Sequence, residues 1–541
     1  MYYPLTVRDF LDRAEHVYPD RIGIVDEPDQ PARSLGELSY RAMAQNARAQ
    51  AARLDQLGVP VGGRVAVISQ NSARLLTSFF GVSGWGRVLV PINFRLAQPE
   101  IEYIVRHCGA DVVYADPSCK AMLDGLEVTH KFLLGEDEDL YLRDTEPAEW
   151  AEPDEGATAT INYTSGTTAR PKGVQLTHRN LWLNATVFGL HETISDRDVY
   201  LHTLPMFHAN GWGMPYGITG VGGTHIVLRQ VDGTEILRRI ERHGVTIMCT
   251  APAVVNAALD GAASWDGPVP GRDRVRIVVA GAPPPSKTIE RVMTELGWEF
   301  TQIYGLTETS PIVTVNRMRA EWDELPAIDR ARKLMRAGAP ALGVRVAVDL
   351  DGEVITASNH NLDGYWKQPE ESAKAIRPAA LAPTGGPGAS ASTAALAPTG
   401  GPGASASTAH WFHTGDGGYL DDDGYLVISD RKKDVIISGG ENVSSIEVED
   451  ALTSHPAVRE VAVIGVPDEK WGELVTGLVV RADAADVTAE ELITHCRGSL
   501  AGYKCPKRIE FVESLPRTAT GKLQKFKLRE PYWAGHERQV N

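Results

Sequence analysis

A stretch rich in glycine and hydroxyl residues is the part of this sequence best suited to chemistry. Glycines let backbone N–H groups approach phosphate oxygens, Ser and Thr hydroxyls add hydrogen-bond donors, and lysine neutralises negative charge. These residue types come together at Thr164, Ser165, Gly166, Thr167, Thr168 and Lys172. The stretch predicts a polyphosphate-binding loop, although a segment of this composition is, by itself, also typical of a surface turn.

The position of the lysine separates this loop from that of the P-loop NTPases. In those proteins the lysine directly follows a glycine and precedes Ser or Thr. Here Lys172 precedes Gly173, and Val174 comes next. The spacing therefore disfavours a P-loop NTPase or kinase.

Four further motifs follow along the chain, namely Tyr304–Thr309 (YGLTET), His413–Asp416 (HTGD), Asp430–Asp434 (DRKKD) and Pro516–Lys522 (PRTATGK). With the first loop (YTSGTTxxPKGV), they resemble the signatures of the adenylate-forming superfamily, which includes acyl-CoA synthetases, adenylation domains of peptide synthetases and firefly-type luciferases. The resemblance covers essentially the whole chain and is closest to fatty-acyl-CoA synthetase-like ligases. It implies ATP-dependent activation of a carboxylic acid to acyl-AMP, release of pyrophosphate, and thioester formation with CoA.

The resemblance also implies a role for each residue that contacts the nucleotide. Glu308 provides a hard oxygen ligand for Mg²⁺, Thr307 contacts the α-phosphate, and Tyr304 stacks on adenine. Asp416 accepts hydrogen bonds from the ribose hydroxyls, and Arg431 assists it. Together these groups meet the need of adenylation to hold a metal ion and to stabilise charge on phosphorus.

Two further segments resemble parts of the family's site. Gly281, Ala282 and Pro283 resemble the segment that flanks adenine, but they are also typical of a turn after a strand. Lys522 is implied to be the catalytic lysine, a mobile charge that reaches the carboxylate and the α-phosphate.

Family members use one site for two half-reactions by rotating the C-terminal domain. The hinge position of the family falls on Lys433, where a charged, solvent-tolerant residue can absorb a change in φ and ψ. Gly439, Gly440 and Glu441 resemble the segment that lines the route of the CoA pantetheine arm.

The segment Pro205–Trp212 (PMFHANGW) bears on the identity of the acid. Amino-acid-activating relatives carry an aspartate after the phenylalanine, whereas this chain has His208, so an acid without an α-amino group is expected. In fatty-acyl-CoA synthetases, which this segment most resembles, the histidine lies near the carboxylate and the tryptophan gates an acyl tunnel. We therefore expect a hydrophobic pocket with His208, Trp212, Gly213 and Gly222, although simple core packing also suits Trp212.

The motifs leave the acyl acceptor open. CoA and an acyl carrier protein present the same phosphopantetheine thiol, and an enzyme that stops at acyl-AMP would carry the same motifs. The segment Ser358–Asn361 replaces the family's usual turn near the domain junction, which makes the thioester step less secure than adenylation. A catalytically silent acyl-nucleotide binding protein is the third possibility, but the presence of Lys522 and Glu308 argues against it.

Composition and charge exclude other classes. A chain of 541 residues requires at least two domains. A net charge of −16 disfavours binding to nucleic acid, and no stretch approaches the ~20 apolar residues of a membrane span. Five scattered cysteines without a CxxC pair suggest neither disulfides nor zinc and favour the reducing cytoplasm. Whether the chain forms a homodimer is left open.

Short apolar runs alternate with amphipathic segments, which predicts a layered α/β architecture. Expected strands lie at 64–69, 87–91, 111–114, 224–228, 245–250, 274–280 and 299–303. From Gly424 onward a smaller α+β unit is expected, opening with a strand at 425–429; helices are predicted after the capping boxes Ser444–Glu447 and Thr488–Glu491. The change in pattern and the hinge motif Asp430–Asp434 together predict a large adenylate-forming domain over 1–429 and a small mobile domain over 430–541.

One segment departs from this pattern. Residues 379–393 and 394–408 are identical copies of AALAPTGGPGASAST. The repeat has no charge and no aromatic residue, which predicts a disordered loop within 377–409 that serves as a spacer rather than as a docking segment. Because loop closure depends weakly on length, we expect removal of residues 379–408 to leave folding and adenylation largely intact.

Overall fold

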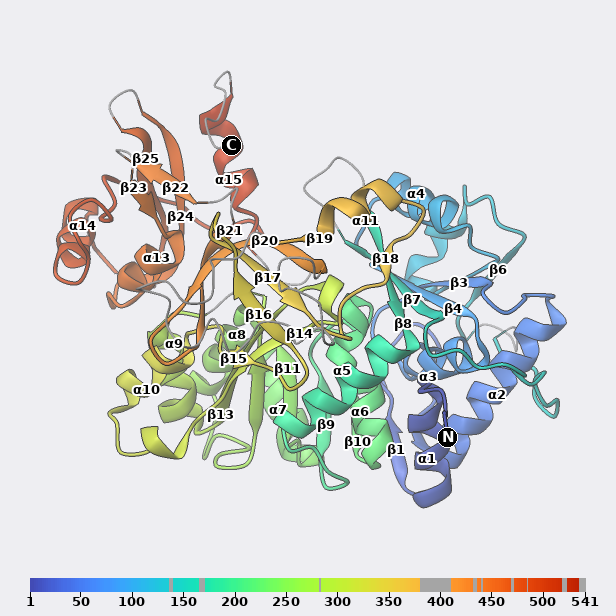
Figure 1. The fold of residues 1–541 in the computed structure, drawn as a ribbon. Helices are drawn as coiled ribbons and strands as arrows, with labels where there is room; N and C mark the ends of the chain where they lie inside the picture. The colour runs from blue at the N-terminus through green and yellow to red at the C-terminus, as the bar shows by residue number, and fades with distance from the viewer. Residues whose placement is uncertain are drawn as a thin grey trace.

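The computed structural model describes residues 1–135, 140–164, 171–281, 284–379, 410–431, 435–438, 441–468, 471–483, 485–517 and 523–534. These residues form a large α/β N-terminal domain with three sheets and a smaller C-terminal domain with one sheet (Figure 1). The predicted fold class is confirmed.

The first half of the large domain is built on a seven-stranded sheet. Its strand order is β18 (Gly364–Tyr365), β8 (Lys172–Thr177), β7 (Thr158–Thr164), β4 (Val88–Ile92), β3 (Arg64–Ile68), β5 (Val112–Ala115) and β6 (His130–Leu133). The parallel strands β3, β4 and β5 are almost wholly buried, because helices cover both faces of such a sheet. The surrounding helices are α1 (Arg8–Val17), α2 (Tyr40–Gln56), α3 (Ala73–Gly81), α4 (Gln98–Cys108) and α5 (His178–His191).

A nine-stranded sheet forms the second half. Its order is β15 (Ala339–Pro340), β14 (Ile312–Asn316), β13 (Glu299–Gly305), β12 (Arg276–Val279), β11 (Ile247–Thr250), β9 (Val199–His202), β10 (Thr224–Val227), β1 (Ile22–Val25) and β2 (Glu37–Ser39). The helices of this half are α6 (Met214–Val221), α7 (Gly233–His243), α8 (Pro252–Ala263), α9 (Ser286–Arg291) and α10 (Ala327–Leu334). All seven strands expected in the large domain are confirmed, with ends that differ by a few residues.

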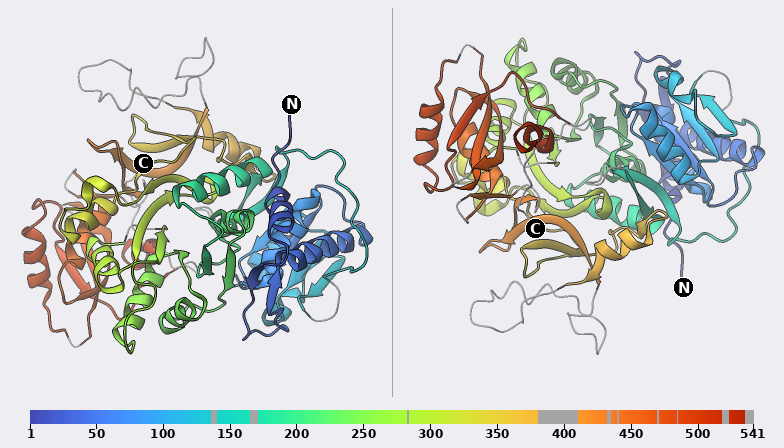
Figure 2. Two further views of the ribbon diagram at one scale, coloured as in Figure 1. Left: turned by 90° about the horizontal axis from the view of Figure 1, so that it is seen from below. Right: turned by 90° about the horizontal axis from the view of Figure 1, so that it is seen from above.

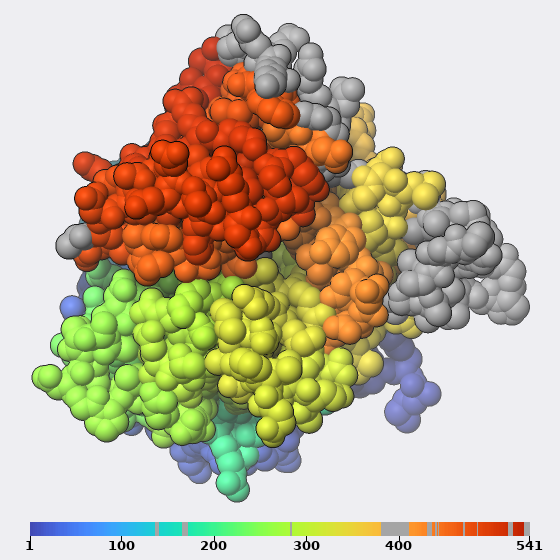
Figure 3. Space-filling model, turned by 90° about the vertical axis from the view of Figure 1, so that its left-hand side faces the viewer, coloured from blue at the N-terminus to red at the C-terminus, as the bar shows by residue number. Residues whose placement is uncertain are grey.

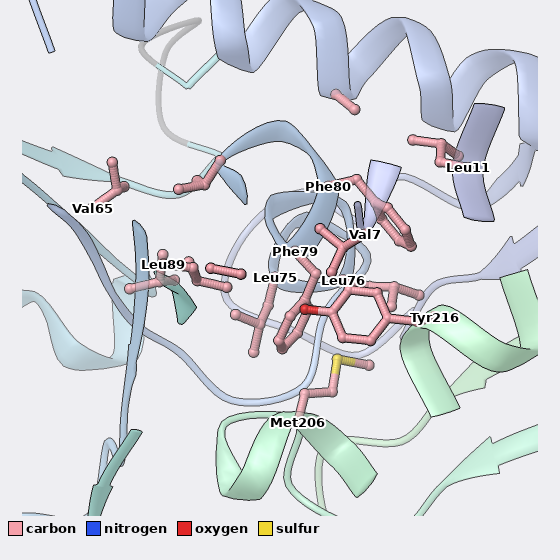
Figure 4. Close-up of a cluster of buried hydrophobic side chains, with 14 of the residues drawn as sticks. Val7, Leu11, Val65, Leu75, Leu76, Phe79, Phe80, Leu89, Met206 and Tyr216 are labelled. Atoms are coloured by element: carbon pink, nitrogen blue, oxygen red, sulfur yellow. The ribbon is translucent and has the colours of Figure 1, made fainter. Parts of the chain in front are cut away.

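The largest core cluster joins the two halves. Figure 4 shows Phe79 and Phe80 of α3 packed around Tyr216 of α6, with Met206 beside them. Both phenylalanine rings meet the Tyr216 ring edge-on, at centroid distances of 5.8 and 5.6 Å. This packing of segments distant in sequence fixes one sheet against the other.

A third, five-stranded sheet lies at the domain junction. It contains β16 (Arg345–Val348), β17 (Glu353–Ala357), β20 (His410–Leu420) and β19 (Ile376–Pro378), and β21 (Leu426–Arg431) pairs with β20. The strand expected to open the second unit therefore completes a sheet of the larger domain, because β20 offers it a free edge. Helix α11 (Pro369–Ala375) precedes β19.

The tandem repeat connects two neighbouring strands. Residues 380–408 of the repeat and Ala409 after it lie outside the described residues, so the disorder expected of this loop stays a prediction. Pro378 of β19 is the register partner of His410 of β20, and Ala379, the first residue of the repeat, is buried against Ile355 and Trp411. The repeat thus begins at a residue that packs in the core.

The pairing of Pro378 with His410 limits how much of the loop between β19 and β20 can be deleted. Removing residues 379–408 would leave one residue, Ala409, between the paired ends Pro378 and His410, whereas a hairpin loop needs at least two. Removal of both copies would therefore require the Pro378–His410 pairing to open, and the expectation that it is tolerated stays a prediction that depends on Arg377, Pro378 and Ala409 spanning the gap before His410.

We expect removal of a single copy, residues 394–408, to be tolerated. Deleting either copy gives the same sequence and keeps an alanine at position 379. Halving the loop changes its closure entropy by only about 0.6 kcal/mol, so the melting temperature should stay close to that of the parent or rise slightly. Paired thermal melts and pyrophosphate-exchange rates check this, and a large drop in either would show that the second copy packs on the enzyme.

The C-terminal domain has a sheet of its own, with β23 (Glu441–Val443), β22 (Ile436–Ser438), β25 (Gly472–Arg481), β24 (Val458–Asp468) and β26 (Arg508–Phe511). Its helices are α13 (Ser445–Thr453), α14 (Ala489–Arg497) and α15 (Lys525–Trp533). The two predicted helix starts are confirmed, because Ser444 and Thr488 each accept a hydrogen bond from the backbone N–H three residues on. Among the described residues, no helix has the length and apolar character needed to cross a bilayer.

The small domain rests on the half that holds the nine-stranded sheet, away from the N-terminal half (Figures 2 and 3). Asp450 of α13 accepts hydrogen bonds from the backbone N–H and the Oγ of Ser286, at 2.8 and 3.0 Å, where α9 begins. A carboxylate at a helix start satisfies otherwise unpaired N–H groups, so this contact holds the domains in their present arrangement.

Candidate active site

The predicted phosphate loop connects two paired strands. Thr164, at the end of β7, is the register partner of Lys172, at the start of β8. Ser165, Gly166, Thr167 and Thr168 lie between them, outside the described residues. The hairpin fixes both ends of the loop, so Lys172 enters the site from a strand rather than from a mobile turn.

Two of the predicted nucleotide residues meet directly. The hydroxyl of Tyr304, near the end of β13, donates a hydrogen bond of 2.7 Å to Asp416 Oδ2 on β20. Asp416 is the register partner of Arg431 on β21, which brings the backbones of the two predicted ribose residues side by side. The structure thus assembles these three positions from two different sheets.

Glu308 and Lys172 are linked through residues of the Gly364–Ala375 segment. The hydroxyl of Tyr365 donates a hydrogen bond of 3.0 Å to Glu308 Oε1, and the Lys172 ammonium lies 5.0 Å from the centre of the Tyr365 ring. Lys172 also pairs with Glu371 of α11, and this hydrogen bond lowers the pKa of Glu371 to about 2. The arrangement holds the candidate phosphate lysine within reach of the candidate metal ligand.

The segment Ser358–Asn361 braces the turn that carries Glu308. Ser310 Oγ donates a 2.7 Å hydrogen bond to the carbonyl of His360, and the N–H of Leu362 donates a 2.7 Å bond to the carbonyl of Glu308. The sequence associated this segment with the thioester step. In the structure it contacts the turn expected to act in adenylation.

A cluster of charged residues holds the turn before Asp416. Glu353 Oε1 accepts a 2.8 Å hydrogen bond from the N–H of Gly415, while its Oε2 lies 3.3 Å from His413 Nδ1. Atoms of Asp349, Glu353 and His413 lie close enough together to hold a metal ion, but Arg377 Nη2 lies 3.2 Å from the same His413 nitrogen. A guanidinium therefore supplies the positive charge of this cluster, and we assign it a structural role.

A small pocket of about 30 Å³, partly open to solvent and lined mainly by apolar residues, lies beside the nucleotide residues. Its walls include Leu204, Ala209, Trp212, Ala251, Ile303 and Pro311, and its polar edge includes His208, Gly281 and Thr307. Trp212 both belongs to a core cluster and lines the pocket, so the two interpretations of this residue are compatible.

The wall that carries His208 and Trp212 has an unusual backbone. Ala209, Asn210, Gly211 and Trp212 all have left-handed dihedral angles, with φ between 39° and 61°. Such angles cost of order 1–3 kcal/mol for a residue other than glycine and persist only where neighbouring contacts impose them. Here Asn210 Nδ2 donates a 2.8 Å hydrogen bond to Thr160 Oγ1 of β7, which ties the acid pocket to the strand leading into the phosphate loop.

A buried asparagine fixes the approach to this wall. The side-chain amide of Asn71 donates to the carbonyls of His202, Leu204 and Leu228 at 3.0 to 3.1 Å. Its Oδ1 accepts a 2.8 Å hydrogen bond from the N–H of Met206, two residues before His208. One side chain therefore joins the ends of β9 and β10 to the segment that carries the candidate acid-binding residues.

Comparison with known proteins identifies this architecture. The model of the AMP-binding enzymes matches residues 11–366, and the model of their C-terminal domain matches residues 447–522. The chain belongs to the AMP-binding enzyme family.

Individual relatives match this AMP-binding enzyme over nearly its full length. It is 35% identical to the 2-methylpropanoate–CoA ligase of Humulus lupulus, with 97% of this chain and 95% of the relative covered. It is also 35% identical to a 4-hydroxybutyrate–CoA ligase of Metallosphaera sedula, at 98% and 94% coverage. The solved fatty acyl-CoA synthetase of Mycobacterium tuberculosis shares 32% identity and a TM-score of 0.69, at 98% and 99% coverage. The enzyme class is thus that of the AMP-forming acid–CoA ligases.

Several predicted residues of the enzyme cannot be placed. Ala282, Pro283, Lys433, Gly439, Gly440 and Lys522 lie outside the described residues, and the Arg431 side chain is not described. Glu441 begins β23 of the C-terminal domain and is exposed. The roles implied for these residues stay predictions.

Two glycines expected in the acid pocket lie elsewhere. A Cβ on Gly213 would meet Asn184 of α5 at 2.6 Å, and one on Gly222 would meet the ring of Tyr18 at 2.2 Å. Both have positive φ, at 82° and 83°. Their small size permits close packing of α6 and its ends, and neither is among the residues that line the pocket beside Trp212.

Sequence reasoning missed Tyr365, Glu371 and Asn71. A signal for Tyr365 existed, since it belongs to a Gly364–Tyr365–Trp366 segment directly after the divergent turn. No comparable pattern marks Asn71, which becomes notable only because its amide reaches three carbonyls at or just beyond the ends of β9 and β10.

Proposed function

We propose that this enzyme activates a hydrophobic carboxylic acid with ATP and transfers the acyl group to CoA. The observation that carries the proposal is the apolar pocket that opens onto Thr307 and Gly281, residues of the motifs expected to hold ATP. An acid whose apolar part fills this pocket would present its carboxylate toward His208 and the α-phosphate.

Both half-reactions follow from this placement. A carboxylate oxygen attacks the α-phosphorus, the bond to the β-phosphate breaks, and acyl-AMP and pyrophosphate form. The CoA thiol then loses its proton and attacks the acyl carbon, and AMP leaves. Lys522 would stabilise the charge that builds on the α-phosphate in the first step.

The nucleotide would be held by residues from three sheets. Thr164, the loop that follows it and Lys172 would bind the phosphates, Tyr304 and Gly281 would flank adenine, and Asp416 with Arg431 would bind the ribose. The Glu308 carboxylate is the type of hard oxygen donor that Mg²⁺ prefers, so its side chain fits the role of metal ligand. A bound Mg²⁺ would screen the phosphate charges.

We favour CoA over a carrier protein as the acceptor because relatives matched along their whole length are named as CoA ligases. Rotation about Lys433 would bring Gly439, Gly440 and Glu441 toward the acyl-AMP for the second step. The alternatives are transfer to a carrier-protein phosphopantetheine and release of acyl-AMP.

Acid-dependent exchange of labelled pyrophosphate into ATP tests the proposal. We expect exchange with apolar acids. The panel starts from four-carbon acids such as 2-methylpropanoate, because a relative is named as a ligase for that acid. It then extends to longer fatty acids and to aryl and terpenoid acids. Amino acids should give none, because His208 stands where an ammonium-pairing aspartate would be required. Absence of exchange across the whole panel would contradict the proposal.

Mass spectrometry of the products then separates the acceptors. Acyl-CoA should form when CoA is supplied. Efficient acylation of a phosphopantetheinylated carrier protein, with no acyl-CoA, would favour the first alternative, and accumulation of acyl-AMP alone would favour the second.

A further inference from the structure

The ring of Tyr365 lies between the two charged side chains expected to meet the phosphates and the metal. Its hydroxyl donates to Glu308 Oε1 at 3.0 Å, and its ring lies 5.0 Å from the Lys172 ammonium. Glu308 comes from the turn after β13 and Lys172 from β8, so Tyr365 connects residues from two sheets.

The backbone of Tyr365 is itself fixed. β18 adds to the edge of the seven-stranded sheet, with Tyr365 opposite Val174 of β8. The N–H of Tyr365 donates a 2.8 Å hydrogen bond to Ser372 Oγ of α11, and the side chain is 8% exposed. A buried aromatic ring with two rotatable bonds, held at its backbone on both sides, gives its hydroxyl a defined position.

The hydroxyl acts as the donor. Its O–H points to Glu308 Oε1, and an ionised carboxylate oxygen can only accept a hydrogen bond. A hydrogen bond from a neutral hydroxyl to a carboxylate oxygen fixes the side-chain rotamer without neutralising the charge. The direction of the second carboxylate oxygen is fixed as well.

The same segment holds the backbone beneath Glu308. Leu362, three residues before Tyr365, donates its N–H to the Glu308 carbonyl at 2.7 Å. Backbone and side chain of Glu308 are therefore both fixed from residues 358–365. Groups that orient a metal ligand in this way commonly matter about as much as the ligand they hold.

We propose that Tyr365 is a positioning residue that orients the Glu308 carboxylate toward the metal–nucleotide complex. This inference rests on the proposed function, in which Glu308 ligates the metal. Tyr365 does not touch the reacting atoms; it fixes the direction from which Glu308 offers its oxygen and stacks beside Lys172.

The test is Tyr365→Phe, which removes one oxygen and keeps the ring. Mn²⁺ serves as the probe, with binding followed by electron paramagnetic resonance in the presence of an ATP analogue whose α,β-bridge is a methylene group. We expect Mn²⁺ to bind about tenfold more weakly to the variant. The KM for the acid and the melting temperature should stay close to the parent values. If Tyr365 had only a structural role, its loss would instead lower the melting temperature.

Tyr532→Phe is the matched control. Its hydroxyl donates a 2.6 Å hydrogen bond to Glu510 Oε2, which makes it the same pair of groups in the C-terminal domain. This variant should bind Mn²⁺ as the parent does. Equally weakened Mn²⁺ binding in both variants would overturn the proposal, because the effect would then not be specific to the hydrogen bond between Tyr365 and Glu308.

A double-mutant cycle with Glu308→Gln completes the test. If Tyr365 acts through the Glu308 carboxylate, removing the hydroxyl in a Glu308→Gln background should change Mn²⁺ affinity little further. Additive losses, or unchanged Mn²⁺ affinity in Tyr365→Phe alone, would overturn the proposal. A parent enzyme that exchanges pyrophosphate but binds no Mn²⁺ would overturn this inference alone; a parent that does neither would overturn the proposed function too.

Discussion

Replacing Lys522 with alanine should reduce adenylation by about 10²- to 10³-fold, the loss typical of a transition-state charge donor. Thioester formation from supplied acyl-AMP should stay within a few-fold of the parent, because the rotation expected of the C-terminal domain would carry Lys522 away from the site before that step. The rate of pyrophosphate exchange and the rate of acyl-CoA formation from synthetic acyl-AMP are each measured for the parent and for the variant.

The anchoring of the lysine loop supports this separation of effects. Arg517 and Leu523 form a β-bridge that closes the segment containing Lys522, and Arg517 pairs with Glu460 at 2.7 Å. Removing one lysine side chain should therefore leave the C-terminal domain folded. Lys527→Ala, an exposed lysine of α15, is the matched control and should retain both half-reactions. Equal losses in both half-reactions of Lys522→Ala would refute the rotating-domain assignment.

Glu308→Gln should give the second large effect, a loss of adenylation of about 10²-fold or more, because a neutral amide oxygen replaces the carboxylate expected to hold Mg²⁺. Glutamine has the same shape and can still accept the hydrogen bond from Tyr365, so the melting temperature should change little. The Mg²⁺ concentration that gives half-maximal pyrophosphate exchange should rise.

The control for Glu308→Gln is Glu321→Gln, an exposed residue that pairs with Arg319 on the surface. Surface ion pairs contribute little to stability, so this variant should have the melting temperature and the pyrophosphate exchange of the parent. Retention of parental exchange and parental Mg²⁺ dependence in Glu308→Gln would show that the metal is held by other groups.

Local patterns were sufficient to predict the α/β class, seven strands of the large domain and two helix starts of the small one. Continuous apolar runs such as Arg64–Ile68 become buried parallel strands, because their side chains are apolar on both faces. The S-x-x-E and T-x-x-E patterns start helices at Ser444 and Thr488, because the cap and its hydrogen-bond partner lie within one turn. The YGLTET motif likewise contributes Gly305, Leu306 and Thr307 to the pocket lining, and its Tyr304 contacts Asp416 of the HTGD motif.

Prediction from the sequence failed where contacts between residues far apart in the chain determine the local structure. The strand at Leu426–Arg431 looked like the start of a second unit, but pairing with β20 assigns it to the first, since strand partners are not encoded locally. Gly222 suggested an open pocket, whereas the ring of Tyr18, some two hundred residues away in sequence, occupies that space. In the turn Ala209–Trp212, Asn210 and Gly211 are residue types that adopt left-handed backbone readily, but Ala209 and Trp212 are not, and contacts with Thr160 and Asn184 hold the turn in this form.

The sequence by itself determined the enzyme family and the α/β class, and it supplied the prediction of the nucleotide residues, because these depend on short motifs whose members lie within a few positions of one another. Only the tertiary structure decided which groups hold those residues in place. Tyr365 reaches Glu308 across 57 positions, and Asn71 reaches Met206 across 135. Such contacts depend on how two sheets and a returning segment pack, and no local pattern records the partner of a side chain that folding brings in from so far away.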